Sequence, residues 1–562
     1  MPQSVLSLER VLSLLPKRPD DSTLTEALFE SKAEESAREG DALTIEVTPD
    51  RIDLLSEGGL GLYLQGALEL VLGLPKLVVH SALPAAEIRV DPSVESVRPS
   101  IAGVLVSAPT ESGVDEGTLA EAIRFQEQIH ATTGRDRRAA SLGIYPWDRI
   151  SPPISYSLEP IDSVRFVPLG DSEERSGRWF FENHPLAQRY GAWARSKDQC
   201  LTLRDLRGEV LSLPPVLNSR AAGEARPGDR VLLLESTGTR ASRVQESLAL
   251  LLLVFAARNY SVFPVAVRGA SGIEAGTPVF ATRRIHLPGN LTQEISGLDL
   301  KAGEIEHLLA RARLGVHPEA GGWGVEVPAW RPDLLTASDL TEEAILLRGV
   351  RPSEGILPPC TTRGRRRPES HFRHSVEDSL LGLGFSMLYT PVLVSGESVA
   401  LLGRSASIRI ANAASEQFSY LRDSLVLSLA DVLGRNLRQG YPQRFAEVGP
   451  VLRRDPQAEG GASTRFHAGA FLASDTAGFA DGAALVDYLL HRLDVLGVRA
   501  PAELPGTIPG RAARVRIAGD VVAELGEIHP EVLTARRVPV PVVWAELDLS
   551  ALWTLVRRAA TD

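Results

Sequence analysis

The spacing of apolar residues changes several times along the chain, which predicts a mixture of short strands and helices. Apolar residues recur at helical spacing over Val5–Leu15 and Leu60–Leu72, whereas ALTIEV between them alternates like a strand. Further β runs (IAGVLVSA, SLGIY, VLLLE, FPVAV) are interspersed with helical segments such as LAEAIRFQEQIH and Val244–Ala257. These patterns predict an α+β fold.

The length of 562 residues exceeds what one hydrophobic core can serve, so we expect about three to five domains. A Gly/Ala/Pro-containing stretch at Ile273–Pro278 and the basic segment Thr361–Pro368 indicate boundaries. No internal repeat is expected. The predicted domains are an N-terminal α/β module, a central domain, a small module with an acidic helix and a final domain, at 1–75, 76–275, 276–355 and 356–562.

Two patterns describe the final domain. Leucines at every fourth position predict a core helix that Gly440 ends, and RFAEVGPVL follows as a strand. ARVRIA and VVAELGEI predict a hairpin that turns at Ala518–Asp520. His529 and Glu527 could serve as acid and base groups, but a lone histidine beside a proline is more often structural. The leucines are Leu421, Leu425, Leu429, Leu433 and Leu437.

Composition narrows the class of protein. Hydrophobic residues at 44% and charged residues at 23% are typical of globular proteins. The N-terminus does not match a signal peptide, and the longest apolar run, Leu248–Ala257, is about half of a bilayer span, so we expect a cytoplasmic protein without membrane contact. Cys200 and Cys360 are too few and too far apart for a disulfide framework or a zinc site. A net charge of −11 gives no global attraction for nucleic acid.

One acidic cluster has the composition of a metal site. Thr336 and Asp339 have the spacing of a capping box, so a helix is predicted to begin there. Oxygen-only ligands suit a hard cation, Mg²⁺ or Ca²⁺. The alternative is that acidic residues simply favour a helix N-terminus, where each gains about 0.3–1 kcal/mol. The cluster comprises Asp333, Asp339, Glu342 and Glu343.

Other catalytic signatures are missing from the sequence. It contains no GxxxxGK[ST], no HExxH and no GxSxG pattern. The basic run Arg363–Arg367 could contact phosphate, although such runs are more often solvated linkers.

Taken in order, several segments resemble the β subunit of phenylalanyl-tRNA synthetase of the archaeal/eukaryal type. They are VTPDRIDLLSEGGLGLYLQGAL, FQEQIHATTGRDRRAASLGIYPWDRISPPISYS, LSLPPVLNS, LLLESTGT, the acidic helix, LRDSL with GYPQRFAEVG, and IPGRAA with GEIHPEVL. In the first of them Asp50 and Ile52 stand where the family has Asn and Pro. The ordered combination is specific, whereas each motif alone is weak.

The resemblance implies a subunit of phenylalanine–tRNA ligase, a class II aminoacyl-tRNA synthetase. The last domain resembles a degenerate class II antiparallel sheet without the GxGxxR segment that positions ATP, so no aminoacylation residue is expected here. ATP and phenylalanine would bind the α subunit, two α and two β chains would assemble, and the complex would charge tRNA(Phe).

The resemblance also implies two sites. The family's Mg²⁺ positions fall on Asp333, Asp339, Glu342 and Glu343. Its editing pocket, which hydrolyses mischarged tyrosyl-tRNA, falls on Leu203, Ser212, Glu235 and Thr237, with Glu235 in place of Asp. The longer side chain would shift the carboxylate by about one methylene and alter the editing geometry.

Two alternatives stay open at this point. The altered positions would also suit a free-standing paralogue that acts as a trans-editing hydrolase or as a regulatory protein. The small module at Arg283–Gly349, with the Arg363–Arg367 run, could instead bind nucleic acid independently.

Overall fold

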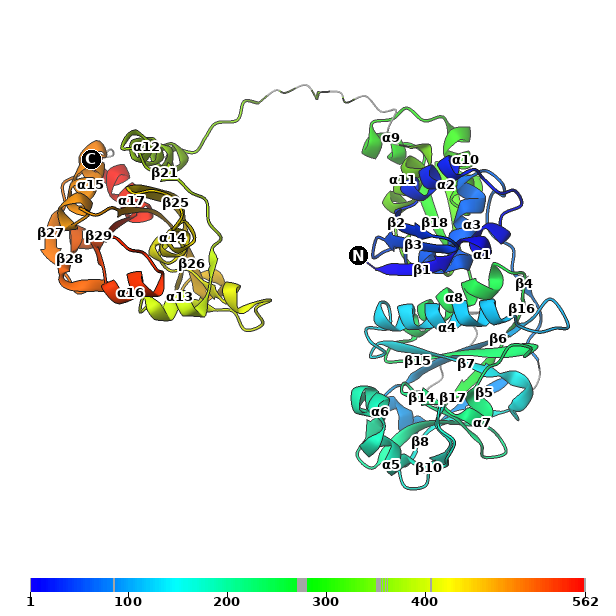
Figure 1. Cartoon of the computed structure of the whole chain (residues 1–562). Helices are drawn as coiled ribbons and strands as arrows, with labels where there is room; N and C mark the ends of the chain where they lie inside the picture. Colours follow the sequence, from blue (N-terminus) through cyan, green and yellow to red (C-terminus); the bar gives the residue numbers. More distant parts are fainter. Residues whose placement is uncertain are drawn as a thin grey trace. The chain divides into compact units, whose positions relative to one another are not determined.

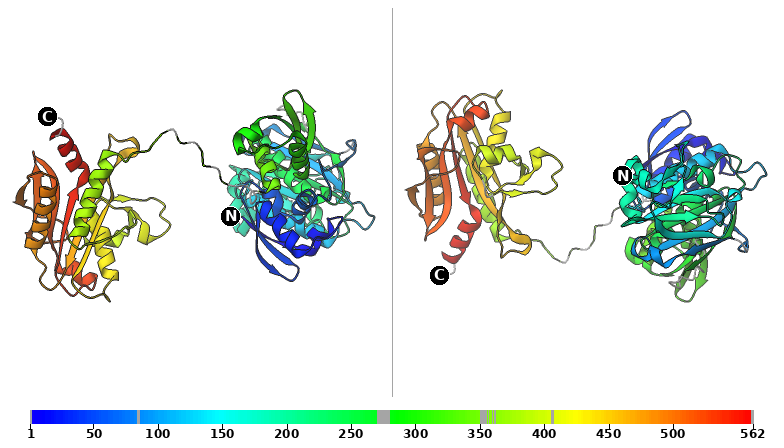
Figure 2. Two further views of the ribbon diagram at one scale, coloured as in Figure 1. Left: turned by 90° about the horizontal axis from the view of Figure 1, so that it is seen from above. Right: turned by 90° about the horizontal axis from the view of Figure 1, so that it is seen from below.

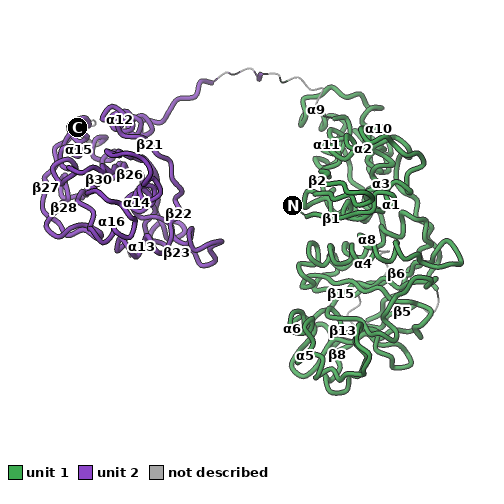
Figure 3. The backbone as a smooth tube through the Cα atoms, in the orientation of Figure 1, with its two compact units in different colours: residues 1–356 green, residues 357–562 purple. Residues whose placement is uncertain are grey.

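The computed structural model describes residues 2–83, 86–269, 280–349, 355, 357–358, 360, 362–404 and 407–559. The chain forms two compact units, Met1–Ile356 and Leu357–Asp562 (Figure 3). The boundary predicted around Ile273–Pro278, and residue 356 where the last predicted domain begins, lie outside the described residues. No helix of the described part of the chain is long and apolar enough to cross a membrane.

The first module of unit 1 is a three-stranded antiparallel sheet with helices against it (Figure 1). The alternating sequence of its central strand buries Leu43, Ile45 and Val47. The hydroxyl of Ser56 accepts a hydrogen bond from the Gly59 N–H at 3.0 Å and caps the last helix. The elements are β1 (Gln3–Ser7), α1 (Leu8–Ser13), α2 (Asp21–Glu30), β2 (Ala33–Glu39), β3 (Ala42–Val47), η1 (Ile52–Leu55) and α3 (Glu57–Ala67).

The last module of unit 1 repeats this arrangement. Its strand order, β18-β20-β19, corresponds to β1-β3-β2, and two helices separate the first two strands of each module. The strands are β18 (Arg283–Pro288), β19 (Gly315–Glu319) and β20 (Gly322–Val327), and the helices are α9 (Leu291–Ser296), α10 (Ala302–Arg311) and α11 (Ala337–Arg348).

The structure thus contains an internal repeat that the sequence analysis did not expect. In both modules the central strand leads into Arg-x-Asp-Leu-Leu, once at Arg51–Leu55 and once at Arg331–Leu335, and a helix follows. The expectation of no repeat is wrong because the likeness lies in the order of elements.

The central domain contains two sheets, ordered β14-β13-β12-β8-β5-β17, with β11 beside β12, and β4-β16-β6-β15-β7. A buried apolar cluster fills the space between them. Helices α4 (Glu116–Ala131) and α8 (Ala241–Ala256) lie against the five-stranded sheet (Figure 1). The strands are β4 (Val78–Val79), β5 (Glu87–Val90), β6 (Ser100–Ser107), β7 (Ala140–Pro146), β8 (Ile154–Pro160), β11 (Arg195–Ser196), β12 (Gln199–Arg204), β13 (Val210–Leu213), β14 (Leu217–Asn218), β15 (Val231–Gly238), β16 (Ser261–Pro264) and β17 (Ala266–Gly269).

An excursion between β8 and β12 adds small elements with an apolar cluster of their own. They are β9 (Arg165–Phe166), β10 (Arg175–Ser176), α5 (Gly177–Asn183), α6 (Pro185–Tyr190) and η4 (Gly191–Trp193), and α7 (Arg220–Gly223) follows β14.

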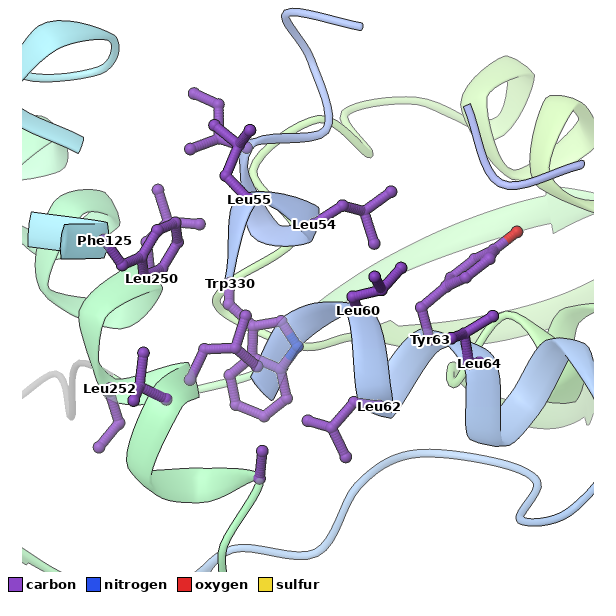
Figure 4. Packing of buried hydrophobic residues seen from close by; sticks show 14 of the residues in the cluster. Leu54, Leu55, Leu60, Leu62, Tyr63, Leu64, Phe125, Leu250, Leu252 and Trp330 are labelled. Atoms are coloured by element: carbon purple, nitrogen blue, oxygen red, sulfur yellow. The ribbon is translucent and has the colours of Figure 1, made fainter. Parts of the chain in front are cut away.

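One hydrophobic core joins the two repeats to the central domain. Figure 4 shows Leu60 and Leu62 of α3 near Trp330, with Phe125 of α4 and Leu252 of α8 in the same cluster. Each fully buried side chain of this kind stabilises the fold by about 1.5–3 kcal/mol. The three parts of unit 1 therefore share one core.

Unit 2 is built on a seven-stranded sheet, ordered β21-β25-β26-β30-β29-β28-β27, with helices on both faces (Figure 2). Alternate residues of β30 belong to two separate buried clusters, which shows that both faces are covered. The chain between β21 and β25 forms a separate small sheet, ordered β22-β24-β23. The strands are β21 (Ser386–Met387), β22 (Leu393–Val394), β23 (Ile408–Arg409), β24 (Tyr420–Leu421), β25 (Gln443–Arg454), β26 (Ala462–Ala473), β27 (Val498–Pro501), β28 (Thr507–Ile517), β29 (Asp520–Ile528) and β30 (Val542–Asp548); the helices are α12 (Pro368–Gly382), α13 (Gly396–Leu401), α14 (Leu425–Arg435), α15 (Phe479–Arg492), α16 (Pro530–Ala535) and α17 (Leu549–Ala559).

The leucine stripe of unit 2 is only partly helical. Ser424 caps α14, so Leu421 lies before the helix and pairs with Leu393 of β22. The helix ends at Arg435, before Leu437 and well before Gly440. The predicted hairpin is confirmed, since Ile517 pairs with Asp520 across a two-residue turn in which both residues have positive φ.

Candidate functional site

The acidic helix predicted from Thr336 and Asp339 forms, and Asp339 holds its first turn. Asp339 Oδ2 accepts hydrogen bonds from the backbone N–H groups of Thr336 at 2.7 Å and Leu335 at 2.8 Å. The Thr336 hydroxyl donates to the same oxygen at 3.1 Å. This carboxylate therefore serves the helix N-terminus.

Asp333 and Glu343 lie deeper and share one arginine. Arg331 Nη2 is 2.7 Å from Asp333 Oδ2 and 2.8 Å from Glu343 Oε1. Arg51 of the first repeat lies 2.9 Å from Asp53 Oδ2 and 3.7 Å from Glu343 Oε1. None of the five side chains exposes more than 6% of its surface. The network thus joins the two Arg-x-Asp-Leu-Leu segments inside the protein.

These buried groups stabilise each other's charges. Burial by itself lowers the pKa of Arg331, but the carboxylates of Glu343 and Asp333 outweigh it and raise that pKa well above its usual value. Burial also raises the pKa of Asp333, yet Arg331 outweighs it and holds the pKa below its usual value. Each carboxylate therefore depends on the arginines for its compensation.

The four predicted magnesium ligands do not converge. Glu342 pairs with Lys32 at 2.9 Å, while Asp333 and Glu343 pair with Arg331. Across the described part of the chain, no group of three or more His, Cys, Asp or Glu side chains is placed to hold a metal ion. In this arrangement the carboxylates do not fit a divalent cation, which needs several converging oxygens. The site stays a prediction from the sequence, on Asp333, Asp339, Glu342 and Glu343.

Replacement of Asp339 by alanine separates the two roles. We expect the free energy of unfolding to fall by about 1 kcal/mol, because two backbone N–H groups lose their acceptor. Bound magnesium, measured by mass spectrometry after dialysis, should not change. Asp339→Asn keeps an acceptor oxygen and should lose less stability. A fall in bound magnesium with Asp339→Ala would contradict the capping role as the whole explanation and support the metal site.

A cavity of about 450 Å³ in the central domain contains two of the predicted editing residues, Ser212 of β13 and Glu235 of β15. Tyr145 of β7 lies between them. Its hydroxyl is 2.9 Å from the Ser212 hydroxyl and donates to Glu235 Oε2 at 3.1 Å. Three polar side chains from three strands therefore meet at the wall of a cavity large enough for a small ligand.

Glu235 has an unusual environment. It is 2% exposed, and its Oε1 atom has no hydrogen-bond partner. Burial raises the pKa of Glu235 to about 8, against the opposing effects of Tyr145, Arg98 and Thr237. The side chain is therefore mainly a neutral carboxyl group at pH 7, able to donate as well as accept a hydrogen bond.

The other two predicted editing residues lie behind the cavity wall. Arg98 Nε donates to the Thr237 hydroxyl at 3.0 Å, and Arg98 Nη2 donates to the Thr237 carbonyl at 2.6 Å and to Ser141 Oγ at 3.1 Å. Leu203 faces Ser212 across the β12–β13 pairing and is buried between the sheets. The structure thus brings Ser212 and Glu235 to the cavity, whereas Thr237 and Leu203 support it.

Sequence reasoning missed two residues of this site, Tyr145 and Arg98. Tyr145 stands in the apolar strand SLGIY, where an aromatic residue is typical of a core position. Arg98 is fully buried in the short segment that precedes β6, and no sequence motif marks it. Their only signal is their polar contact with residues far away in sequence.

A strained turn places an arginine at the cavity. Arg135, Asp136 and Arg137 have φ values of 50°, 54° and 63°, a conformation that is rare for residues with side chains. Arg137 lines the cavity and donates to the carbonyls of Val216 at 2.9 Å and Pro215 at 3.3 Å. The turn therefore places Arg137 at the cavity wall, where its Nη2 atom also pairs with Glu127 at 2.8 Å.

The raised pKa of Glu235 predicts a pH dependence of stability. The pKa of Glu235 is about 8 in the folded protein, above its ordinary value of 4.5. The contribution of this group to the free energy of unfolding is therefore complete below pH 4.5 and is lost as the pH rises through 8. Against Glu235→Gln, wild-type stability should fall by a few kcal/mol across this range. Thermal melting at several pH values measures the difference. Parallel pH curves for the two proteins would contradict a buried, neutral Glu235.

Two of the remaining polar candidates, His529 and Glu527, have structural contacts. His529 Nδ1 accepts a hydrogen bond from the Glu531 N–H at 3.3 Å and caps α16. Glu527 accepts from the Phe479 N–H at 2.9 Å and pairs with Arg511. Arg363–Arg367 is exposed and lacks regular structure, as a solvated linker would be.

Comparison with known proteins finds aminoacyl-tRNA synthetase domains in both units. Residues 285–350 match the tRNA synthetase B5 domain, and residues 354–549 match the phenylalanyl tRNA synthetase beta chain CLM domain. The phenylalanine–tRNA ligase beta subunit of Pyrococcus abyssi is 30% identical over 507 residues, 90% of each chain. That of Korarchaeum cryptofilum is 31% identical over 518 residues, 91% of this chain and 92% of the relative. An N-terminal fragment of the Pyrococcus horikoshii phenylalanyl-tRNA synthetase beta-subunit superposes with a TM-score of 0.58 at 27% identity, over 62% of this chain and 100% of the fragment.

Proposed function

Because the chain belongs to the phenylalanyl-tRNA synthetase β-subunit family, in its archaeal form, we propose that its central domain hydrolyses mischarged tyrosyl-tRNA. The chain is a β subunit of phenylalanine–tRNA ligase, which implies an α-subunit partner and tRNA binding. The observation that supports hydrolysis is the cavity at which Tyr145, Ser212 and Glu235 meet.

The polar side chains of Tyr145, Ser212 and Glu235 offer a means of distinguishing tyrosine from phenylalanine. Tyrosine differs by one hydroxyl, and a site built to hydrogen-bond a hydroxyl rejects the analogue that lacks it by about 10⁴–10⁵. Glu235 Oε1 is unpartnered and buried, so a phenol that enters the cavity supplies its missing hydrogen bond. Phenylalanine would leave the same oxygen without a partner.

Hydrolysis of the ester needs only water. Water attacks the ester carbonyl carbon, the bond to the ribose oxygen breaks, and tyrosine and free tRNA are released. Arg137 lies at the cavity in an ion pair with Glu127 at 2.8 Å, and a phosphate of the tRNA end that carries the amino acid would compete with Glu127 for it. Glu235 and Tyr145 orient the side chain of tyrosine, so that the ester lies within reach of solvent.

Preformed tyrosyl-tRNA(Phe) is the direct substrate for a test. The α–β complex is expected to release tyrosine faster than the ester decays in buffer, because the cavity binds and orients the tyrosyl group. A rate equal to the uncatalysed decay, with the complex still forming phenylalanyl-tRNA, would contradict the proposal. A chain that never associates with an α subunit yet releases tyrosine would instead be a free-standing editing protein.

We further propose that two α and two β chains assemble, and that ATP and phenylalanine bind to α. After β30 the chain continues as LSALWTLVRRA in α17, which lacks a GxGxxR pattern. The arginine that this pattern places on the triphosphate in active class II domains is therefore not supplied by α17, which supports activation of the amino acid on α. Native mass spectrometry of the co-purified complex tests the stoichiometry, and a complex of one α chain and one β chain would contradict it.

A further inference from the structure

Unit 2 contains a second, smaller cavity of about 210 Å³ on one face of its large sheet. Gly469 of β26 faces Leu425 of α14, and His467, two residues earlier on the same strand, shares that face. Glu546 of β30 lies opposite Gly469, and its carboxylate accepts a hydrogen bond from the Leu425 N–H at 3.1 Å. The cavity therefore lies beside the first turn of α14, above charged residues of five neighbouring strands.

The carboxylates at this cavity already have partners. Each accepts a hydrogen bond or forms an ion pair at 2.6–2.9 Å with a neighbouring donor. The pairs are Glu546 with His467, Asp548 with Arg465, Glu524 with Arg514, and Asp423 with Ser407. The acidic residues are therefore not a ready-made cation site.

The buried side-chain atoms without a hydrogen-bond partner among the described cavity residues are donors. Arg404 Nε and Nη2 and His467 Nε2 are buried and make no hydrogen bond. Arg404 Nη1 is 4.0 Å from Glu524 Oε2, and His467 Nε2 is 3.6 Å from Asp548 Oδ2, both beyond hydrogen-bonding distance. No buried side-chain oxygen among the described cavity residues lacks a partner. Two residues that line the cavity thus hold buried donor atoms that lack an acceptor.

His467 carries the charge that such a role requires. Burial by itself lowers the pKa of His467, but the carboxylates of Asp548 and Glu546 outweigh it and raise the pKa. The same pair holds the pKa of Glu546 down at about 2, since the effect of His467 exceeds the effect of burial. With Nδ1 directed to Glu546, the protonated ring has Nε2–H to donate.

We propose that this cavity binds a small oxyanion, a carboxylate or phosphate group, through Arg404 and His467. The guanidinium presents two N–H groups in a plane, which matches two oxygens of such a group, and the imidazolium adds a third donor. At about 30 Å³ per water, 210 Å³ holds roughly seven water molecules, enough for inorganic phosphate or a small carboxylic acid. Unit 2 would therefore retain ligand binding without amino-acid activation.

Calorimetric titration of the α–β complex with inorganic phosphate, and separately with acetate, tests this site. Saturable binding of at least one probe is expected. Arg404→Gln should weaken it by about tenfold or more, because two charge-assisted donors are lost. Arg516→Gln is the matched control, since Arg516 is exposed on β28 and does not line the cavity. It should change binding by less than about twofold.

Each outcome decides the proposal. Binding of phosphate alone identifies a phosphate ligand, binding of acetate alone identifies a carboxylate ligand, and both retain the oxyanion site. Water is the competing occupant, and the absence of saturable binding of either probe up to about 10 mM would overturn the site. Equal losses in Arg404→Gln and Arg516→Gln would also overturn it. If Arg404→Gln fails to fold in a melting experiment, His467→Asn replaces it. Tyrosyl-tRNA hydrolysis depends on unit 1 residues and is read separately.

Discussion

Replacement of Arg331 by methionine is expected to lower the free energy of unfolding of unit 1 by about 3–5 kcal/mol. Arg331 is the arginine shared by Asp333 and Glu343, which are buried at 2.7 and 2.8 Å from its Nη2 atom. Methionine fills much of the same volume but leaves both carboxylates without their main cation. Denaturant unfolding, with a probe that reports on unit 1 alone, measures the loss.

A matched substitution on the surface separates this effect from the general loss of an arginine. Arg284 pairs with Glu319 at 2.7 Å, but its side chain is 58% exposed, so Arg284→Met should cost no more than about 1 kcal/mol. If Arg331→Met costs no more than Arg284→Met, the buried network does not hold the two repeats together. Double substitution of Arg331 and Asp333 by apolar residues should recover part of the stability.

Replacement of Glu235 by leucine is expected to slow tyrosyl-tRNA hydrolysis by about 10²-fold or more, with phenylalanine charging unchanged. Leucine removes the carboxyl group that meets Tyr145 and leaves the cavity wall apolar. Glu235→Gln should retain most of the activity at pH 7, because a neutral amide donates and accepts as a protonated carboxyl does. Initial rates with preformed tyrosyl-tRNA, divided by the uncatalysed rates, give both comparisons.

The pH dependence of tyrosyl-tRNA hydrolysis provides a control for the comparison of Glu235→Leu with Glu235→Gln. Since the pKa of Glu235 is about 8, the wild-type rate relative to background should fall above that pH, whereas the Glu235→Gln profile should stay flat. Glu209→Gln, at an exposed position of the same domain, should behave as wild type. Activity as low in Glu235→Gln as in Glu235→Leu would show that the ionised carboxylate is required instead.

The sequence predicted the local elements better than the contacts between them. The hairpin at Thr507–Ile528 and the helix at Thr336 follow from alternation and capping, which are properties of neighbouring residues. The helix predicted from the leucine stripe was too long, because the periodicity did not show that Ser424 caps the helix. Local patterns therefore locate elements but do not fix where buried polar residues end them.

The polar sites depended on distant residues and were harder to predict. The ion pairs of the acidic cluster with Arg51 and Lys32, which lie about 300 residues earlier in the chain, could not be predicted from the local sequence. In the cavity, the resemblance to a family pointed to Ser212 and Glu235, whereas Tyr145 joins them only once three strands align. No local pattern carries that information.

Selective release of tyrosine tests the account most directly. The α–β complex would be given equal amounts of tyrosyl-tRNA(Phe) and phenylalanyl-tRNA(Phe) at pH 7, and the initial rates of ester loss compared. We expect tyrosine to be released at least about 10²-fold faster than phenylalanine, since only tyrosine offers a hydroxyl to Glu235 and Tyr145. Equal rates for the two esters would contradict the assignment of this cavity.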